Sequence, residues 1–250
     1  NNKYGKSLPL NYQYELSAVI YKILSKADQQ YTHWLHENGF QFENKRFKLF
    51  NFSRLQFPKN GFEIDTQKGC LLIKSNRVNW YLSFLPEKST LNFIQGAFTE
   101  QSFVVGDKKN KVEFFITKID ALSFPEVTEN TIFRTLSPVC IAERNEKGKS
   151  DYLSPDDPKA ISFLQSALIN RYEAFYQKEF SGSRNFDFRL LNTPKPVLIK
   201  IKTDTPQQTF VKGYLFNFQL HADPELLKIM YECGLGSKNS TGFGFIDVKN

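Results

Sequence analysis

Four glycines fall within eleven residues near the C-terminal end of the sequence, in the stretch 234–244. The apolar pattern of residues 226–231 predicts a helix before this stretch, and residues 243–248 predict a short strand after it. The glycines therefore belong to the loop of a helix–loop–strand unit, and Gly234 fits a left-handed helix cap. Glycines also let a backbone approach a ligand closely, so that its N–H groups can bind an anion such as phosphate.

We expect this glycine-rich loop, defined as residues 234–244, to face phosphate. A P-loop or a dinucleotide fingerprint is excluded, because both follow a strand and open a helix. In a plainer interpretation the glycines only cap a helix and turn the chain. That interpretation suits one glycine better than four interspersed with lysine, asparagine and serine. The loop residues assigned to binding are Gly234, Gly236, Lys238, Asn239, Ser240, Gly242 and Gly244.

The charge and the aromatic content suit a nucleic-acid partner. The net charge is +7, and the sequence contains 25 phenylalanines and 11 tyrosines. Phosphates attract lysine and arginine, and aromatic rings stack on bases. An AT-rich genome enriches Phe, Lys, Asn and Tyr as well, so composition alone does not decide between these explanations.

The cysteine pattern argues against a metal centre. Cys70, Cys140 and Cys233 are far apart and include no CxxC pair. We therefore expect no zinc, no cofactor and no disulfide framework, but three reduced, buried thiols in a cytoplasmic protein. No signal peptide or membrane-length apolar run is present, so no membrane contact is expected.

The order of helical and strand patterns divides the chain into domains 1–124 and 125–250. The first half predicts helices 13–26, 28–37 and 86–98, and strands 47–55, 70–74, 78–84, 103–105 and 112–119. The second half predicts helices from 155 to 180 and from 224, and strands 132–141, 186–191, 197–202, 210–220 and 243–248. This order indicates an α+β fold of two tandem ferredoxin-like (RRM-like, βαββαβ) domains. The first domain lacks an opening strand, which we attribute to residues missing before Asn1.

The glycine-rich loop, the tandem order and the stretch 48–55 together resemble the CRISPR-associated repeat-cleaving endoribonucleases, the "Cas-six" family of the RAMP superfamily. That family ends in G-h-G-x-x-x-S-x-G-h-G, where h is hydrophobic, and Gly234, Gly236, Ser240, Gly242 and Gly244 match it position for position. Residues 49–53 match its K-L-F-T-Y/F-S run. The resemblance implies repeat-RNA binding, but the C-terminal motif is shared with relatives that bind RNA without cutting it.

The resemblance also implies three catalytic residues. Archaeal-type members assign catalysis to a tyrosine in the first helix, a histidine shortly after it, and a lysine opening the K-L-F run. The matching residues are Tyr21, His36 and Lys48, with His33 as a less well-matched competitor for His36. Structural roles remain open for each: a solvent-facing histidine, a solvated lysine and a tyrosine at the edge of the core.

These residue types suit metal-free RNA cleavage, in which the 2′-OH attacks its own phosphate and leaves a 2′,3′-cyclic phosphate and a 5′-OH. Histidine is the natural acid or base near neutral pH. Lysine can neutralise developing phosphate charge. Tyrosine, with an ordinary pKa of about 10, suits positioning by hydrogen bonding. No carboxylate cluster has metal-ligand spacing.

Further phosphate contacts are expected at Arg54, Lys200, Lys202, Lys212 and Lys238, with Lys200 and Lys202 on one strand face. We expect bulky residues at Gly236 and Gly242 to weaken RNA binding with a modest loss of stability. The partners implied are CRISPR repeat RNA or crRNA, and the resemblance leaves open other Cas proteins and a homodimer. Two other functions compete: a non-catalytic RNA-binding subunit of an effector complex, and an unrelated ferredoxin-like metabolic enzyme.

Overall fold

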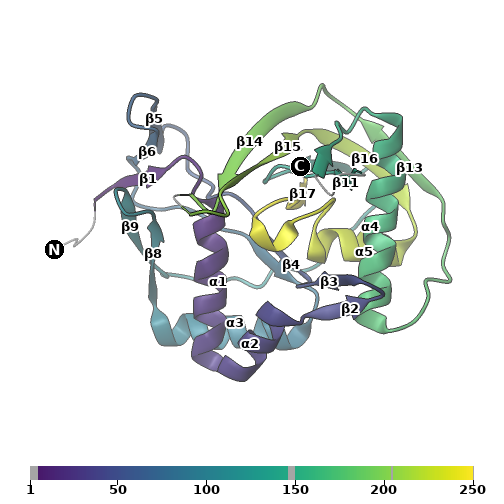
Figure 1. Cartoon of the computed structure of the whole chain (residues 1–250), viewed down its shortest axis with the longest axis horizontal. Coiled ribbons are helices and arrows are strands. Elements are labelled where there is room, and N and C mark those ends of the chain that lie inside the picture. The colour runs from purple at the N-terminus through teal and green to yellow at the C-terminus, as the bar shows by residue number, and fades with distance from the viewer. Residues whose placement is uncertain (1–4, 146–149, 204, 250) are drawn as a thin grey trace.

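The computed structural model describes residues 5–145, 150–203 and 205–249, and the two halves of the chain lie side by side (Figure 1). The N-terminal half carries three helices among short strands, and the C-terminal half carries two helices against a four-stranded sheet. Separate clusters of buried apolar side chains form the cores of the two halves. In the described part of the chain, no helix is both long and apolar enough to cross a membrane.

The sheet of the C-terminal half is antiparallel and has the strand order β13-β16-β10-β17. Its strands are β10 (Ile132–Thr135), β13 (Phe186–Leu190), β16 (Asn217–Ala222) and β17 (Ile246–Val248). Helix α4 (Pro158–Tyr176) lies between β10 and β13 in the chain, and α5 (Pro224–Cys233) lies between β16 and β17. This is the βαββαβ order of a ferredoxin-like domain, as the sequence predicts. Leu164 and Leu168 of α4 share one core with Phe133 and Phe218 of the sheet.

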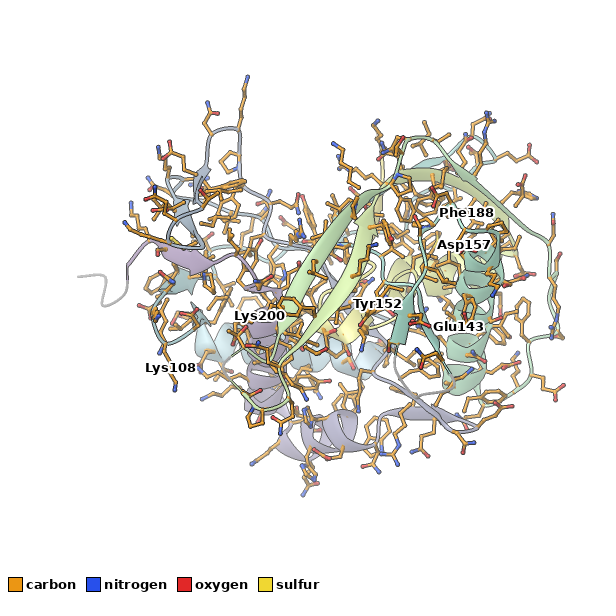
Figure 2. All side chains as sticks on the ribbon, turned by 45° about the horizontal axis from the view of Figure 1, so that its top comes forward. Lys108, Glu143, Tyr152, Asp157, Phe188 and Lys200 are labelled. Carbon is orange, nitrogen blue, oxygen red and sulfur yellow. The ribbon has the colours of Figure 1, made fainter. Side chains whose placement is uncertain are left out.

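A long hairpin interrupts this order between β13 and β16. Its strands, β14 (Lys195–Ile201) and β15 (Thr209–Leu215), pair with each other as a two-stranded sheet, and Tyr214 of β15 also forms a bridge with Val139. The single strand expected over 210–220 was therefore wrong, because the chain leaves the hairpin at Leu215 and enters the main sheet at Asn217. The hairpin reaches the N-terminal half, where the backbone N–H of Lys200 donates to Asn11 Oδ1 at 3.2 Å. Figure 2 shows Lys200 toward this end of the hairpin.

The expected same-face pair Lys200 and Lys202 is also wrong. Strand β14 ends at Ile201, and Lys202 has a left-handed φ of 52° in the turn beyond it. A second small pair, β11 (Ala142–Arg144) with β12 (Ser150–Tyr152), follows β10 in the chain.

The N-terminal half begins with a strand, contrary to the expectation that its opening strand is missing. Strand β1 (Ser7–Pro9) pairs antiparallel with β6 (Cys70–Ile73), which also pairs with β5 (Phe62–Asp65). Leu8 is fully buried at the centre of β1. A three-residue strand that ends in proline shows no alternation, so its pattern gives no signal.

Helix α1 (Gln13–Ala27) packs closely on α3 (Glu87–Glu100). A Cβ atom at Gly96 would lie 1.9 Å from the carbonyl oxygen of Ile23, so only glycine permits this approach. Helix α2 (Gln29–Glu37) begins at Asp28, whose carboxylate accepts from the Tyr31 N–H at 2.8 Å. The remaining strands are β2 (Phe40–Phe42), β3 (Lys45–Phe47), β4 (Phe50–Phe52), β7 (Leu82–Phe84), β8 (Ser102–Gly106) and β9 (Lys111–Phe115).

The single strand expected over 47–55 is replaced by two short ones. Strand β3 pairs with β2, whereas β4 pairs with β7. Between them Leu49 is buried with a left-handed φ of 53°, which breaks the extended chain. Lys48 therefore lies at a corner between two strands.

Candidate functional site

Three of the side chains predicted to be catalytic meet where α1, α2 and the β3–β4 corner come together. The ring of Tyr21 on α1 contacts the imidazole of His36 on α2 edge to face, with 4.9 Å between the ring centroids. Lys48 Nζ donates a hydrogen bond to the backbone carbonyl of His36. Phe50 of β4 packs on the other side of Tyr21, with 5.6 Å between centroids. The site is thus assembled from three elements whose packing fixes its geometry.

The imidazole of His36 is open to solvent on one side and held on the other. Its side chain is 61% exposed, and its Nδ1 lies 2.8 Å from Oε1 of Glu37. The bond to His36 is the main reason why the pKa of the Glu37 carboxyl lies below its ordinary value. An ionised carboxylate only accepts, so Nδ1 carries the proton and Nε2 is left for another partner.

His33 lies one turn earlier on α2, and its side chain is exposed. The ring contact of Tyr21 is with His36, and the amine of Lys48 bonds to the His36 carbonyl. The geometry therefore brings His36, rather than His33, together with the other two predicted residues.

Burial changes the acid–base character of the lysine and the tyrosine. Desolvation lowers the pKa of Lys48, an effect that Glu37 opposes and Arg46 reinforces. Desolvation alone raises the pKa of Tyr21 well above its ordinary value. Tyr21 therefore keeps its proton at neutral pH and can act only as a neutral hydroxyl, whereas Lys48 loses its charge at a lower pH than a free lysine does.

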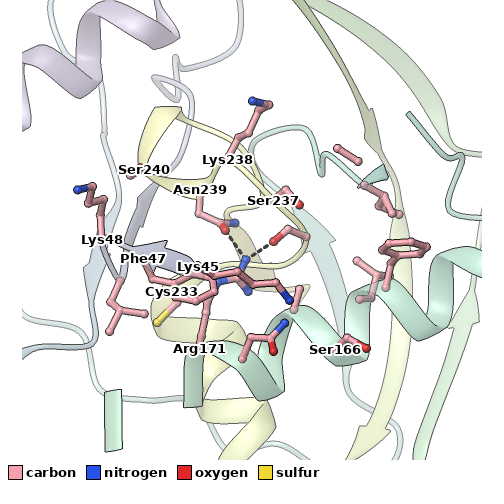
Figure 3. A pocket seen from close by; sticks show the side chains of 18 of the residues that line it. Lys45, Phe47, Lys48, Ser166, Arg171, Cys233, Ser237, Lys238, Asn239 and Ser240 are labelled. Atoms are coloured by element: carbon pink, nitrogen blue, oxygen red, sulfur yellow. Dashed lines mark hydrogen bonds between the residues drawn. The ribbon is translucent and has the colours of Figure 1, made fainter. Parts of the chain in front are cut away.

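Lys48 also lines a pocket of about 490 Å³ between the β3–β4 corner, α4 and the glycine-rich loop (Figure 3). Its basic lining residues are Lys45, Arg46, Lys48, Arg171 and Lys238. Serine and asparagine side chains supply further polar groups, and none of the described residues that line the pocket is Asp or Glu. A concave site with one sign of charge concentrates the opposite charge, so this pocket favours an anion.

The glycine-rich loop closes one side of this pocket, but its glycines face inward. All four are buried with positive φ. A Cβ atom at Gly244 would lie 2.0 Å from the carbonyl oxygen of Leu235, and one at Gly236 would lie 2.4 Å from that of Cys140. The glycines are therefore required for packing, and contact of their backbone with phosphate stays a prediction. Lys238 is exposed at the outer turn of the loop, with Ser237 and Ser240 half-buried beside it.

Both halves of the chain hold the loop from within. From α1, Ser17 Oγ donates to the carbonyl of Ser240 at 2.6 Å, and Gln13 Nε2 donates to the carbonyl of Gly242. From α4, the buried guanidinium of Arg171 donates to the carbonyls of Gly234 and Gly236.

Asn239, which the sequence assigns to RNA, is buried and fully engaged inside the loop. Its Oδ1 accepts from Arg171 Nη2 at 2.6 Å. Its Nδ2 donates to the carbonyls of Leu235 at 3.2 Å and Phe243 at 3.1 Å. These three bonds hold the side chain within the loop at the edge of the pocket, and its contact with RNA stays a prediction. Sequence reasoning missed Arg171, because a lone arginine within a helical pattern carries no signal of the loop it contacts.

The other predicted phosphate contacts lie outside the pocket. Arg54 is half-buried, its backbone N–H donates to the carbonyl of Leu136 and its Nε donates to Gln13 Oε1 at 3.1 Å, so the phosphate contact expected of it stays a prediction. Lys200 and Lys212 share the outer face of the β14–β15 hairpin with Leu198 and Phe210, which are 61% and 50% exposed. Lys202 is exposed in the turn beyond.

The cysteines are free and buried, as expected. Burial raises the pKa of the Cys140 and Cys233 thiols to about 12, which keeps both protonated. Among the residues that the structure describes, no group of three or more His, Cys, Asp or Glu side chains is arranged to hold a metal ion.

Comparison with known proteins identifies relatives along the whole chain. The curated relatives include proteins named as endoribonucleases. CRISPR-associated endoribonuclease Cas6 1 of Methanocaldococcus jannaschii is 31% identical over 242 residues, which cover 96% of this chain and 86% of the relative. CRISPR-associated endoribonuclease Cas6 of Pyrococcus furiosus is 26% identical, and the match covers 97% of this chain and 84% of the relative.

Solved structures extend the likeness to the fold. A structure described as CRISPR associated protein Cas6 has a TM-score of 0.75 and 30% identity, covering 100% of this chain and 96% of its own. A Cas6-related protein from Pyrococcus furiosus has a TM-score of 0.83 and 24% identity, with coverage of 100% and 95%. These neighbours confirm the expected α+β fold of tandem ferredoxin-like domains.

Family models match both halves of the chain. Residues 7–120 match the model described as CRISPR-associated protein Cas6, N-terminal, and residues 122–248 match CRISPR associated protein Cas6, C-terminal. The chain therefore belongs to the Cas6 family of CRISPR-associated proteins.

Proposed function

We propose that this protein is a metal-independent endoribonuclease that cleaves CRISPR repeat RNA in the precursor transcript to release guide crRNAs. The observation that carries the proposal is the meeting of Tyr21, His36 and Lys48 at the edge of a basic pocket. Relatives of the chain are named endoribonucleases, which supports the same class of reaction. Residues 1–124 then form the catalytic domain, and residues 125–250 contribute the loop that closes the pocket.

In the proposed reaction the 2′-oxygen attacks the adjacent phosphorus, and the bond from phosphorus to the 5′-oxygen breaks. The products are a 2′,3′-cyclic phosphate and a 5′-OH. His36 acts through Nε2, because Nδ1 is occupied by Glu37: it either takes the proton of the attacking 2′-OH or gives a proton to the leaving 5′-oxygen, and water carries the other proton. Lys48 neutralises charge on the pentavalent phosphate. Tyr21 stays protonated and positions the imidazole or donates a hydrogen bond.

The RNA backbone then passes from this site into the pocket beside it. Lys45, Arg46 and Lys238 lie on its exposed rim and suit phosphate contacts. Ser240 of the glycine-rich loop also lines the pocket and suits a hydrogen bond to phosphate or sugar. Lys200, Lys202 and Lys212 on the hairpin extend the basic surface toward the N-terminal half.

Incubation with the protein's own repeat RNA in EDTA tests the proposal. The expected result is a single cut whose upstream product ends in a cyclic phosphate and whose downstream product carries a 5′-OH. An RNA with one 2′-deoxy nucleotide at the cut site should bind and stay intact, because it lacks the nucleophile. Cleavage that stops in EDTA would overturn metal independence. Binding without any cleavage would favour the alternative, a non-catalytic subunit of an effector complex.

A further inference from the structure

Arg171 is a buried arginine to which neither the family match nor the proposed reaction assigns a part. It lies on α4 with only 4% of its surface exposed, and its guanidinium points into the glycine-rich loop (Figure 3). Within the described residues no ion pair includes Arg171, so carbonyl and amide oxygens surround its charge instead of a carboxylate. Burial lowers its pKa to about 10, which leaves the group charged at neutral pH.

The hydrogen bonds of Arg171 fix the inner side of the loop. Nη1 donates to the carbonyl of Gly234 at 3.1 Å, and Nη2 donates to the carbonyl of Gly236 and to Asn239 Oδ1. Asn239 in turn donates to the carbonyls of Leu235 and Phe243. One planar guanidinium and one amide thus engage four carbonyl oxygens on the concave side of the loop.

The hydrogen bonds of Arg171 and Asn239 also affect the side of the glycine-rich loop that faces the pocket. Lys238 has a left-handed φ of 59°, and the short 3-10 turn Asn239–Thr241 that follows it depends on the position of Asn239. Lys238 and Ser240 line the pocket from this turn, and Arg171 lines it from α4. The buried charge, which no carboxylate cancels, adds to the positive potential of the same pocket.

We propose that Arg171 is a positioning residue for RNA binding: through Asn239 it holds the glycine-rich loop in the shape that presents Lys238 and Ser240 to RNA phosphate. The inference rests on the proposed function, because it assigns a role within the same pocket. Lysine cannot replace this arginine, since a single ammonium lacks the planar fork that reaches both carbonyls and the amide.

Arg171→Lys and Asn239→Ala, alone and combined, test the role. The control is Leu168→Ala on the same helix, which destabilises the core but removes none of the hydrogen bonds that hold the loop. All variants are compared at a temperature where circular dichroism shows each one folded. Dissociation constants are measured for repeat RNA, and single-turnover cleavage rates are measured at saturating RNA.

We expect Arg171→Lys to weaken RNA binding about tenfold, the size expected when buried acceptors lose their donor. The cleavage rate at saturation should stay close to that of the parent, because the catalytic residues lie on α1, α2 and the β3–β4 corner and not on the loop. Leu168→Ala should bind as the parent does. The double variant should bind repeat RNA with about the affinity of the single variant that binds less tightly, because both changes act on one loop.

Each arm has an outcome that contradicts the inference. If folded Arg171→Lys binds RNA like the parent, or Leu168→Ala weakens binding equally, Arg171 serves stability alone. Additive effects of Arg171→Lys and Asn239→Ala would exclude action through one loop. If the parent protein fails to bind repeat RNA, the proposed function is overturned and this inference falls with it. If the parent binds repeat RNA and the variants bind it equally well, only this inference is overturned.

Discussion

The ring of Tyr21 meets the imidazole of His36 edge to face at 82°, with 4.9 Å between the ring centroids. The contact joins α1 to α2 and fixes the plane of the imidazole. Glu37 binds Nδ1 of the same ring, and Lys48 binds the carbonyl of the same residue. His36 is therefore the point at which the three predicted catalytic groups are connected.

Replacement of His36 by alanine should reduce cleavage by roughly 10²–10⁴-fold, the usual value of general acid–base transfer. Repeat-RNA binding should change little, because the basic residues that line the pocket supply the charge that attracts phosphate. Single-turnover rates and a filter-binding or anisotropy assay measure the two quantities on the same preparation.

His33→Ala is the matched control, since it removes an exposed histidine from the same helix. Its cleavage rate should equal that of the parent. Fast cleavage by His36→Ala together with slow cleavage by His33→Ala would assign the chemistry to His33 instead.

Tyr21→Phe keeps the ring and removes only the hydroxyl. Because burial holds the pKa of Tyr21 well above its ordinary value, the hydroxyl does not ionise in the working pH range. We expect a smaller loss of rate than for His36→Ala or Lys48→Ala, and Tyr21→Ala should lose more because the ring contact goes too. Equal losses for Tyr21→Phe and His36→Ala would give the hydroxyl a direct part in proton transfer.

Lys48 should set the alkaline limb of the pH–rate profile. A lysine is charged below its pKa, and burial lowers that pKa, so the charge is lost at a lower pH than for a free lysine. The rate should fall as pH rises through the lowered pKa.

Lys48→Arg, whose guanidinium stays charged, should remove this limb even where the rate near neutral pH is reduced. Rates need correction for spontaneous RNA hydrolysis at each pH. An alkaline limb that is unchanged in Lys48→Arg would show that another group controls it.

The three residues predicted to be catalytic could be named from the sequence because their signal is local. Tyr21, His36 and Lys48 each stand at a fixed place in a helix or beside a motif, so matching the pattern locates them. The glycine-rich loop could be located in the same way. A glycine required by close packing and a glycine required by a ligand look identical in a sequence, and only the contacts of Gly236 and Gly244 show that packing requires them.

The features that the sequence missed depend on contacts between distant residues. Arg171 reaches a loop 63 positions further along the chain, and nothing near it in sequence marks that contact. Strand β1 is too short to show alternating apolar and polar residues, and its pairing with β6 makes this segment a strand. The break at Leu49 requires a positive φ, and a leucine in a sequence does not predict one.

Salt should weaken RNA binding steeply. Each neutralised phosphate of a single strand contributes about −0.7 to the slope of log K against log salt. Lys238→Ala should therefore reduce the magnitude of that slope by about 0.7, because Lys238 is exposed beside the pocket. Lys68→Ala, in the exposed turn between β5 and β6, should leave it unchanged. A flat response of the parent would contradict binding through phosphates.

Gly244→Ala should destabilise the whole junction between the two halves. The added Cβ would lie 2.0 Å from the carbonyl of Leu235, at a left-handed φ of 79°. The sequence alone suggested a modest cost for bulky residues at Gly236 and Gly242, whereas at Gly244 the structure implies about 3 kcal/mol or more, because strain and overlap act together. Gly69→Ala separates the two effects, since Gly69 has a left-handed φ of 63° but no atom within 4 Å of the added Cβ. It should cost only about 1 kcal/mol, the strain alone. Urea unfolding monitored by circular dichroism gives both values, and equal losses in the two variants would mean that the loop relaxes to accept the methyl group.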